Sequence, residues 1–420
     1  MFLRLTKKYK SIVIWVALVM SNKKVVLAFS GGLDTSVCVK YLQNKQKMDV
    51  ITTTVDCGQE EDFDAIRKKS EMLGAIKHVN VDAKKEFVEK YVYRSIRANG
   101  LYQGKYPLAT ALARPLISEK IMKVAAQEGA AAVAHGCTGK GNDQVRFDIA
   151  MSSIDPSIKI IAPIREMNLT RDRELAYAKK NNVPLNDEIK KYSTDTNIWG
   201  RAIEAGQLED PWLEPPEEIF SLVKNKMIPP EYLEIEFEKG TPVGVDNKKM
   251  NLLEIIRYLN VKAGKHGVGV VDHIEDRVVG IKTREIYEAP AAQTILAAHK
   301  DLEQLVLTKH ELSFKQLVED KWSWMVYSGL WFDPLREDLD RFIDATQNRV
   351  SGKVRMKLQN GSFRVVGRKS KYSLYRQTLA TYASDSVFDQ NLAKGFIELW
   401  GMETLIANKL SKNLSKEARR

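Results

Sequence analysis

A short glycine-rich segment, Ser30-Gly31-Gly32-Leu33-Asp34-Thr35-Ser36, has the residue types of a phosphate-binding loop. Two consecutive glycines let a backbone approach an anion closely with several N–H groups pointing at it, and the hydroxyls of Ser30, Thr35 and Ser36 add donors. A helix that begins near Thr35 adds the positive end of its dipole. The segment therefore predicts a phosphate cradle, in preference to a glycine turn in which Asp34 only caps a helix.

This segment differs from both common nucleotide-binding motifs. The GxxxxGK[ST] pattern is absent because no lysine follows the glycines, and the GxGxxG spacing is missing as well. Asp34 would repel phosphates unless it binds a bridging cation or orients a neighbouring group. The segment resembles the SGGxDS loop of the ATP pyrophosphatases, which implies attack on the α-phosphate of ATP and release of pyrophosphate.

A second glycine-rich segment, AHGCTGKGNDQVRF at residues 134–147, also follows an apolar run. Arg146 offers a planar fork that can bind a carboxylate or a ureido oxygen through two hydrogen bonds. Asp143 can accept from an ammonium group, and Thr138 and Asn142 stand beside it. The cluster is suited to an amino acid, so we expect an amino-acid substrate.

The elements that position these segments follow from the pattern of apolar residues. In the first half, short apolar runs alternate with amphipathic stretches, which is typical of a parallel sheet covered by helices, and so we expect a doubly wound α/β domain. Strands are predicted at 25–29, 50–55, 78–81 and 130–134, and helices at 35–44, 62–73, 85–98 and 115–128. Ligands of such sheets lie beyond the carboxyl ends of the strands, so both glycine-rich segments should face one crevice.

The second half has the pattern of an α+β domain. Proline-rich segments at 209–218 and 228–234 indicate an interdomain loop, and hairpin turns are predicted at Lys239-Gly240 and Asn360-Gly361. Helices are predicted near 252–264, 291–306 and 391–408. The last of these carries exposed-type apolar residues that either pack on another subunit or close the chain's own core.

The net charge of +11 lies almost entirely at the two ends of the chain. Residues 1–24 carry +6 and residues 409–420 carry +4, which leaves +1 for the body between them. Such a body is a poor surface for a polyanion, so we expect no nucleic-acid partner.

The beginning of the chain and its cysteines bear on compartment. Residues 1–22 hold a basic stretch and an apolar run that is too short to span a bilayer, and we expect an extension that is disordered or precedes a true start at Met20, with no membrane partner. Three widely spaced cysteines, Cys38, Cys57 and Cys137, favour neither a disulfide framework nor a zinc site.

Further stretches extend the resemblance from about Lys23 to the C-terminal helix, in family order. They are YPLATALARP (106–115), YSTDTNIWGR (192–201), LEDPW (208–212), AGKHGVGVVDHIEDR (263–277) and REIYEAPAA (284–292). With the two glycine-rich segments they are similar to the argininosuccinate synthase family, in a bacterial-type form. The resemblance implies a cytoplasmic homotetramer in arginine biosynthesis that ligates L-citrulline and L-aspartate through a citrullyl-adenylate. It implies ATP as a substrate, with Mg²⁺ carried on the nucleotide and no separate metal site.

The resemblance also implies roles for individual positions. Asp34 and Arg146 would be the catalytic residues. The ATP contacts would be Ala28, Phe29, Ser30, Gly31, Gly32, Leu33, Asp34, Thr35, Ser36, Val55, His135 and Gly136. The aspartate contacts would be Thr138, Asn142 and Asp143. The citrulline contacts would be Tyr106, Asn142, Arg146, Ser193, Ala202, Glu275 and Tyr287.

Two positions depart from the family pattern. Ala111 and Ala202 stand where some members have a serine, so Ala202 can contribute only its backbone.

The resemblance also implies the domain organisation. The implied domains are an extension at 1–22, a nucleotide-binding domain at 23–185, a synthetase domain at 186–388 and a C-terminal oligomerisation helix with a basic tail at 389–420.

Two other functions compete with this one. An ATP pyrophosphatase that thiolates tRNA would need a reactive thiol, for which Cys137 in the second segment is the candidate, and a nucleic-acid surface. A nucleotide-sensing module would need no second substrate pocket. The near-neutral body and the set of Tyr106, Arg146, Glu275 and Tyr287 favour the ligase.

Overall fold

The computed structural model describes residues 23–184, 191–224 and 227–417. The chain divides into two units, of which the first ends at Tyr372 and the second begins at Ser373, and each is described by itself. The extension expected at 1–22 lies outside the described residues, as does the domain boundary expected between residues 185 and 186.

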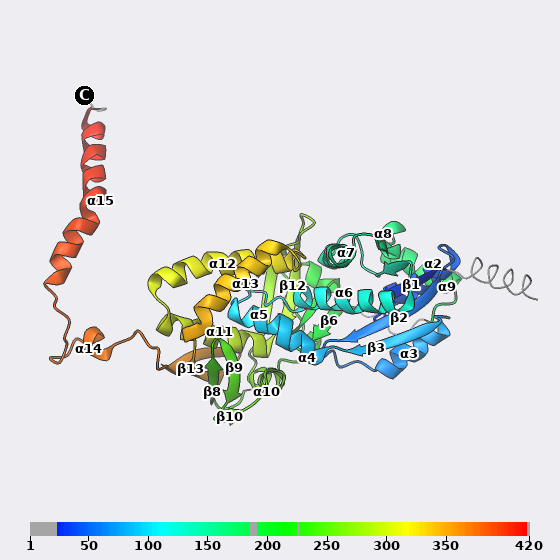
Figure 1. Cartoon of the computed structure of the whole chain (residues 1–420), viewed down its shortest axis with the longest axis horizontal. Helices are drawn as coiled ribbons and strands as arrows, with labels where there is room; N and C mark the ends of the chain where they lie inside the picture. The colour runs from blue at the N-terminus through cyan, green and yellow to red at the C-terminus, as the bar shows by residue number, and fades with distance from the viewer. Residues whose placement is uncertain (1–22, 185–190, 225–226, 418–420) are drawn as a thin grey trace, which may run out of the picture. The chain divides into compact units, whose positions relative to one another are not determined.

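A five-stranded parallel sheet forms the first half of the first unit (Figure 1). Its strands, in spatial order, are β3 (Lys77–Asp82), β2 (Asp49–Asp56), β1 (Lys24–Ala28), β4 (Ala132–Ala134) and β5 (Lys159–Ile161). The four expected strands are confirmed, and β5 was not predicted. The chain moves outward from β1 to β3 and then returns to the other side of β1 with β4. The order therefore reverses between β1 and β4, where a doubly wound sheet opens a crevice.

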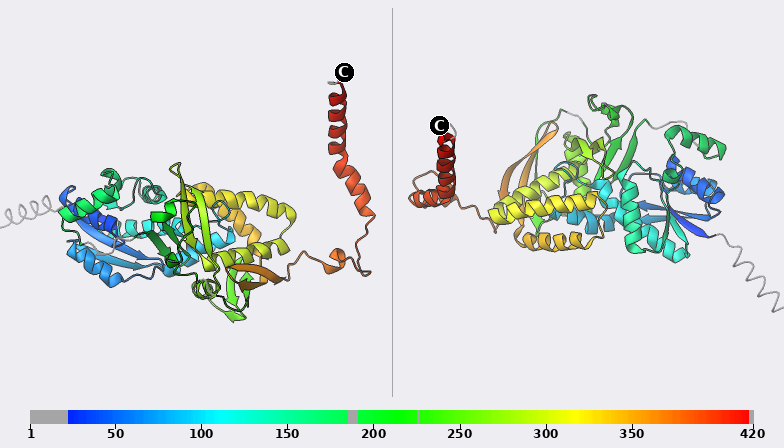
Figure 2. Two further views of the ribbon diagram at one scale, coloured as in Figure 1. Left: turned by 180° about the vertical axis from the view of Figure 1, so that it is seen from behind. Right: turned by 90° about the horizontal axis from the view of Figure 1, so that it is seen from above.

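Helices cover both faces of the parallel sheet (Figure 2), and the side chains of β1 alternate between these two layers. Val25 and Leu27 pack with α2 (Leu33–Asn44), α8 (Pro163–Glu166) and α9 (Arg171–Lys180). Val26 packs on the opposite face with α6 (Ala109–Glu128) and α7 (Asn142–Ile154). Because both faces are covered, the strand is apolar throughout, which is why a continuous apolar run predicted it correctly.

Two helices differ from their predicted bounds. α6 begins at Ala109, six residues before the predicted start, and contains Pro115. Proline at this depth removes a single N–H, and the good helix formers before it supply the first turns. The helix expected at 85–98 is three consecutive segments, with a π-helical turn between two α-helical ones. They are α4 (Lys84–Glu86), η1 (Phe87–Val92) and α5 (Tyr93–Arg97).

Two antiparallel sheets form the second half of the first unit. One has the order β11 (Val270–Asp276), β12 (Lys282–Glu288), β7 (Gly200–Glu204) and β6 (Ser193–Asn197). The other has the order β10 (Lys248–Lys249), β9 (Thr241–Val245), β8 (Glu231–Glu238), β13 (Gly352–Gln359) and β14 (Ser362–Lys369). Both predicted hairpin turns are confirmed, and Asn360 (φ 46°) and Gly361 (φ 76°) have the left-handed backbone that such a turn requires.

Helices pack against these sheets. The predicted helices near 252–264 and 291–306 are α10 (Leu252–Lys265) and α11 (Pro290–Val306), followed by α12 (Lys309–Tyr327) and α13 (Pro334–Thr346). Capping boxes at Asn251 and Thr308 fix the starts of α10 and α12. No helix among the described residues is long and apolar enough to cross a membrane.

One large hydrophobic core joins the two halves of the first unit. It runs from Val55 at the end of β2, through Leu112 of α6 and Trp199, to Leu302 of α11 and Leu358 of β13. The core crosses the boundary near residue 185 that the sequence implies, so the separation of a nucleotide-binding and a synthetase domain there remains a proposal.

The second unit contains α14 (Gln377–Ala380) and α15 (Leu392–Glu417). The predicted C-terminal helix is confirmed and is longer than 391–408. Phe396, Leu399, Trp400 and Leu405 are all exposed in the single chain, with Trp400 76% exposed. An apolar face of this extent needs a partner surface.

Candidate active site

One cleft of about 2320 Å³ opens at the carboxyl ends of β1 and β4 and extends to β6, β7, β11 and β12. With the exception of Ser36, every residue to which the sequence assigned a binding or catalytic role lines this cleft. From the first half these are Ala28, Phe29, Ser30, Gly31, Gly32, Leu33, Asp34, Thr35, Val55, Tyr106, His135, Gly136, Thr138, Asn142, Asp143 and Arg146, and from the second half Ser193, Ala202, Glu275 and Tyr287.

The two glycine-rich segments meet at the point where the strand order reverses. Gly31 has a φ of 75°, and a Cβ placed on it would lie 3.1 Å from the Ile66 side chain of α3 (Phe63–Met72). A Cβ on Gly136 would lie 3.0 Å from the Cγ2 of Thr35, so the second segment packs directly on the first. The Ser30 and Thr35 hydroxyls are 3.3 Å apart and solvent-exposed. Backbone and hydroxyl donors of both segments therefore face one crevice.

Ser36 lies elsewhere, which corrects the prediction that its side chain faces a phosphate. It is fully buried in α2, and its hydroxyl donates to the Gly32 carbonyl at 2.6 Å. Its N–H donates to the same carbonyl at 3.1 Å. Helix formation has already used both donors, because the helix begins at Leu33 and not near Thr35.

Asp34 faces one arginine and one buried carboxyl group from α9. The Arg171 Nη1 lies 3.4 Å from an Asp34 oxygen and 3.3 Å from a Glu174 oxygen. Glu174 is 5% exposed, and burial together with the neighbouring Asp34 raises its pKa to about 8. Asp34 itself is half exposed, so its carboxylate remains accessible from the cleft.

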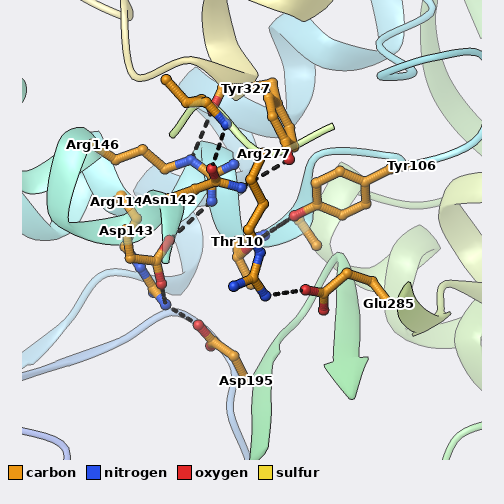
Figure 3. A network of polar contacts seen from close by, with 12 residues as sticks. Tyr106, Thr110, Arg114, Asn142, Asp143, Arg146, Asp195, Arg277, Glu285 and Tyr327 are labelled. Carbon is orange, nitrogen blue, oxygen red and sulfur yellow. Dashed lines mark hydrogen bonds and ion pairs between the residues drawn. The ribbon is translucent and has the colours of Figure 1, made fainter. Parts of the chain in front are cut away.

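Arg146 is a deeply enclosed cation of the cleft wall, with 4% of its surface exposed (Figure 3). Its Nε donates to the Tyr327 carbonyl at 2.9 Å, and its Nη1 lies 2.9 Å from an Asp143 oxygen. The guanidinium lies over the Tyr327 ring at 4.9 Å. Its Nη2 is buried and has no hydrogen-bond partner among the described residues. A charged donor of this kind is costly to leave unpaired, so it indicates a missing acceptor.

Asp143 is held between two arginines. One of its oxygens lies 2.6 Å from Arg114 of α6, and Arg114 also pairs with Asp195 of β6 (Figure 3). Burial alone would raise the pKa of Asp143, but the charges of Arg114 and Arg146 outweigh it and hold that pKa below its usual value. The carboxylate therefore stays ionised and can accept from an ammonium group.

Glu275 of β11 accepts hydrogen bonds from two buried tyrosines. The Tyr287 and Tyr327 hydroxyls each donate to it at 2.6 Å, and the Asn142 amide donates to the Tyr327 hydroxyl at 2.8 Å. Burial, reinforced by the Glu275 charge, raises the pKa of both tyrosines well above the usual value. They therefore remain neutral donors. The ring of Tyr106 stacks on Tyr287 at 4.1 Å between centroids and closes this wall.

Other predicted residues have defined places around this network. His135 is buried, with its Nε2 2.8 Å from Asp148, and its Nδ1 accepts from the Cys137 N–H. Ala202 of β7 is the strand partner of both Asp195 and Tyr287. Thr138 and Ser193 are exposed at the rim of the cleft.

The structure also brings in residues to which the sequence assigned no role. They are Thr110, Arg114, Asp195, Arg277, Glu285 and Tyr327 (Figure 3). Arg277 pairs with Glu204 and lies 2.6 Å from Glu285, and the next residue, Val278, donates its N–H to Asn142 at 2.8 Å. Arg114 and Asp195 lie inside the family-like stretches, and their place there could have identified them as site residues from the sequence. Tyr327 lies in none of these stretches, and no pattern of residues pointed to it.

A doubly wound sheet with an SGG loop at its reversal point, continuous with a pocket of buried arginine, carboxylate and tyrosine side chains, defines an ATP pyrophosphatase-type nucleotide-binding enzyme. Residues 24–184 match the model of the arginosuccinate synthase N-terminal HUP domain, and residues 192–407 match that of the arginosuccinate synthase C-terminal domain. The chain belongs to the argininosuccinate synthase family and is an enzyme of the ligase class.

Relatives from distant organisms agree with this assignment. The chain is 56% identical over 387 residues to an argininosuccinate synthase of Pyrococcus furiosus, covering 91% of this chain and 94% of the relative. It is 52% identical over 400 residues to that of Dehalococcoides mccartyi (94% and 98%) and 52% identical over 396 residues to that of Dictyoglomus turgidum (94% and 100%).

Among solved structures, a U34-tRNA thiolase from Methanococcus maripaludis with its [4Fe-4S] cluster covers 40% of this chain and 60% of its own. It has 19% sequence identity and a TM-score of 0.27, a likeness too low to carry an argument about fold or function.

Proposed function

We propose that this enzyme ligates L-citrulline and L-aspartate at the expense of ATP in arginine biosynthesis. The citrulline ureido oxygen attacks the α-phosphorus, and pyrophosphate leaves. The aspartate amine then attacks the activated carbon and expels AMP, which gives argininosuccinate. Adenylation is needed because a ureido oxygen is a poor leaving group.

One observation carries the proposal. Arg146, whose buried Nη2 has no partner among the described residues, lines the same cleft as the SGG loop. A nucleotide site and a buried, incomplete amino-acid site thus share one space, which is what direct adenylation of an amino acid requires. A nucleotide sensor would have no use for the second site.

ATP occupies the first part of the cleft in this proposal. Its phosphates take the backbone donors of residues 30–35 and the dipole of α2, and its remaining contacts come from Val55, His135 and Gly136. The helix begins directly after the second glycine, so its positive end faces the departing diphosphate. Catalysis rests on position and charge, with no protein nucleophile.

The two amino acids occupy the pocket around Arg146. Arg146, Asn142 and the tyrosine pair on Glu275 hold citrulline, with Tyr106, Ser193 and the Ala202 backbone around it. The ionised Asp143, Asn142 and Thr138 hold aspartate. Asp143 accepts a hydrogen bond from the aspartate ammonium group until the amine attacks the activated carbon of citrulline.

Magnesium enters with the nucleotide. Mg²⁺ prefers oxygen ligands and usually takes one or two carboxylates together with substrate phosphates. The accessible Asp34 carboxylate at the start of α2 fits that pattern. When bound, the ion would supply charge neutralisation at the phosphates, and Asp34 is the side chain that would hold it.

The thiolating alternative is not favoured. Burial raises the pKa of Cys137, with the Asp143 charge adding to it, so the thiol stays protonated at neutral pH. A thiol-dependent modifier needs the opposite shift.

We further propose a cytoplasmic homotetramer. The exposed apolar face of α15 supports association between subunits, because such a face needs a partner.

Pyrophosphate release tests the ligation directly. The full chain is incubated with ATP, citrulline and aspartate, and each is omitted in turn. We expect release to require ATP and citrulline, with argininosuccinate formed only when aspartate is present. Release that ignores both amino acids would reject the proposal.

A further inference from the structure

A lysine from a different element contacts the SGG loop. Lys69 lies on α3, and its Nζ donates to the Gly31 carbonyl at 2.8 Å. The side chain also lines the cleft. The contact joins residues separated by 38 positions, so the glycine motif itself gives no sign of this lysine.

Lys69 is partly buried without a counter-charge. In the described part of the chain, no carboxylate is paired with its ammonium group, and burial alone lowers its pKa. Two other partly buried lysines of this half of the unit are paired with carboxylates, Lys84 with Asp56 and Lys120 with Glu86. An ammonium group has three donors, and Gly31 takes one. A desolvated cation with spare donors at a phosphate loop indicates an anionic ligand.

α3 also fixes the direction of the loop's donors. The peptide between Gly31 and Gly32 is trans, so its N–H points opposite to its carbonyl. Because Lys69 binds that carbonyl, the Gly32 N–H is directed to the other side of the peptide, where it donates to the Ser30 hydroxyl at 3.4 Å. The Ile66 side chain packs against Gly31, where a Cβ would lie 3.1 Å from it, so the same helix contacts the loop at two points.

We propose that Lys69 is the phosphate-loop cation of this enzyme, which orients the Gly31–Gly32 peptide and binds the departing diphosphate with its free donors. The proposal deepens the ligase function and rests on it. Lys69 thereby supplies from α3 the charge that a lysine within the motif supplies in the common P-loop.

Binding of inorganic pyrophosphate to the full chain tests this by calorimetry. The variants are Lys69→Met, which removes charge and donors, and Lys69→Gln, which keeps an amide donor for Gly31 but has no charge. The matched control is Lys40→Met. Lys40 also donates to a backbone carbonyl, that of Leu73 at 2.9 Å, but lies outside the cleft lining.

We expect both Lys69 variants to bind pyrophosphate about tenfold or more weakly, since a charge-assisted hydrogen bond is lost, while Lys40→Met binds it like the wild type. KM for ATP should rise in both, and KM for citrulline should not change. Wild-type affinity in Lys69→Gln would overturn the proposal, as would equal losses in Lys40→Met or a wild type that binds no pyrophosphate.

This assay separates the two proposals. Pyrophosphate binding needs neither amino acid, so Lys69 can be supported even if pyrophosphate release proves independent of citrulline. Conversely, citrulline-dependent release with unchanged pyrophosphate affinity in the Lys69 variants would leave the ligase function standing and reject the role of Lys69.

Discussion

The SGG loop and the pocket around Arg146 share one cleft but are built in opposite ways. The loop consists of consecutive residues, offers mainly backbone groups and is partly exposed. The pocket consists of buried and partly buried side chains from α6, α7, β6, β11, β12 and α12, which are held by polar contacts with one another. Figure 3 shows how few of these neighbours are close in sequence.

Under the proposed function, the difference matches what each ligand group requires. A phosphate is recognised by any set of N–H groups that converge on it, and a short turn before a helix provides them. An uncharged ureido group needs donors and acceptors at fixed places, and only side chains locked by packing provide those. Substitutions in the loop should therefore act on chemistry alone, whereas substitutions in the pocket should affect both binding and stability.

The largest effect is expected from Asp34→Ala in the loop. We expect turnover to fall roughly 10²- to 10³-fold, because the carboxylate that would hold Mg²⁺ is removed and the charge of the phosphates is no longer neutralised. The thermal midpoint should barely change, since the half-exposed pair with Arg171 contributes only about 0–1 kcal/mol. Pyrophosphate release and thermal unfolding measure the two quantities. Marked unfolding of this variant would break the contrast between loop and pocket.

A smaller but double effect is expected from Arg146→Lys in the pocket. A single ammonium group cannot satisfy the Tyr327 carbonyl, Asp143 and the substrate together. KM for citrulline should rise about tenfold or more, and the free energy of unfolding should fall by about 1–3 kcal/mol. Arg341→Lys, at an exposed ion pair on α13, is the control. An unchanged KM for citrulline would contradict the assignment.

Asp143→Asn should show the pocket's ionisation through pH. The pKa of Asp143 is lowered in the fold, so its stabilising contribution is complete above the unfolded value of about 3.9 and is lost as pH falls through the folded value. The variant should be less stable than the wild type by about 1–3 kcal/mol at pH 7, and this difference should shrink below about pH 4. Urea unfolding at several pH values measures it, and a difference independent of pH would show that Asp143 is not ionised.

The smallest effect is expected from Ser36→Ala, which marks the edge of the loop site. Its hydroxyl bonds the Gly32 carbonyl within α2 and does not reach the cleft. KM for ATP should stay unchanged, and the free energy of unfolding should fall by about 1 kcal/mol. A rise in KM without any loss of stability would return Ser36 to the phosphate site.

Sequence reasoning reached the parts of the molecule whose cause is local. Val25–Leu27 is a strand because both sheet faces are buried, and Asn360-Gly361 turns because both residues tolerate positive φ. Within the loop, Ser36 is the residue that does not line the cleft, because the exact start of a helix decides which way a hydroxyl points.

The partners of the pocket residues had no local signal. Tyr327 is the last residue of α12, where a tyrosine is as suitable for a core as for a site. Lys69 lies in a charged stretch of an ordinary amphipathic helix, and only the packing of α3 beneath the loop separates it from its neighbour Lys68. Contacts of this kind depend on the folded arrangement and not on spacing.

The core that α6 shares between the parallel sheet and the antiparallel sheets has a practical consequence. A fragment that ends near residue 184 would lose the part of this core that the second half supplies, so Leu112 and Leu116 would become open to water. Tyr106 would also lose its stacking partner Tyr287. Such a fragment should aggregate when made alone and recover when co-expressed with the remainder. The first unit should then melt in one calorimetric transition, so that neither catalytic half can be inherited or engineered without the other.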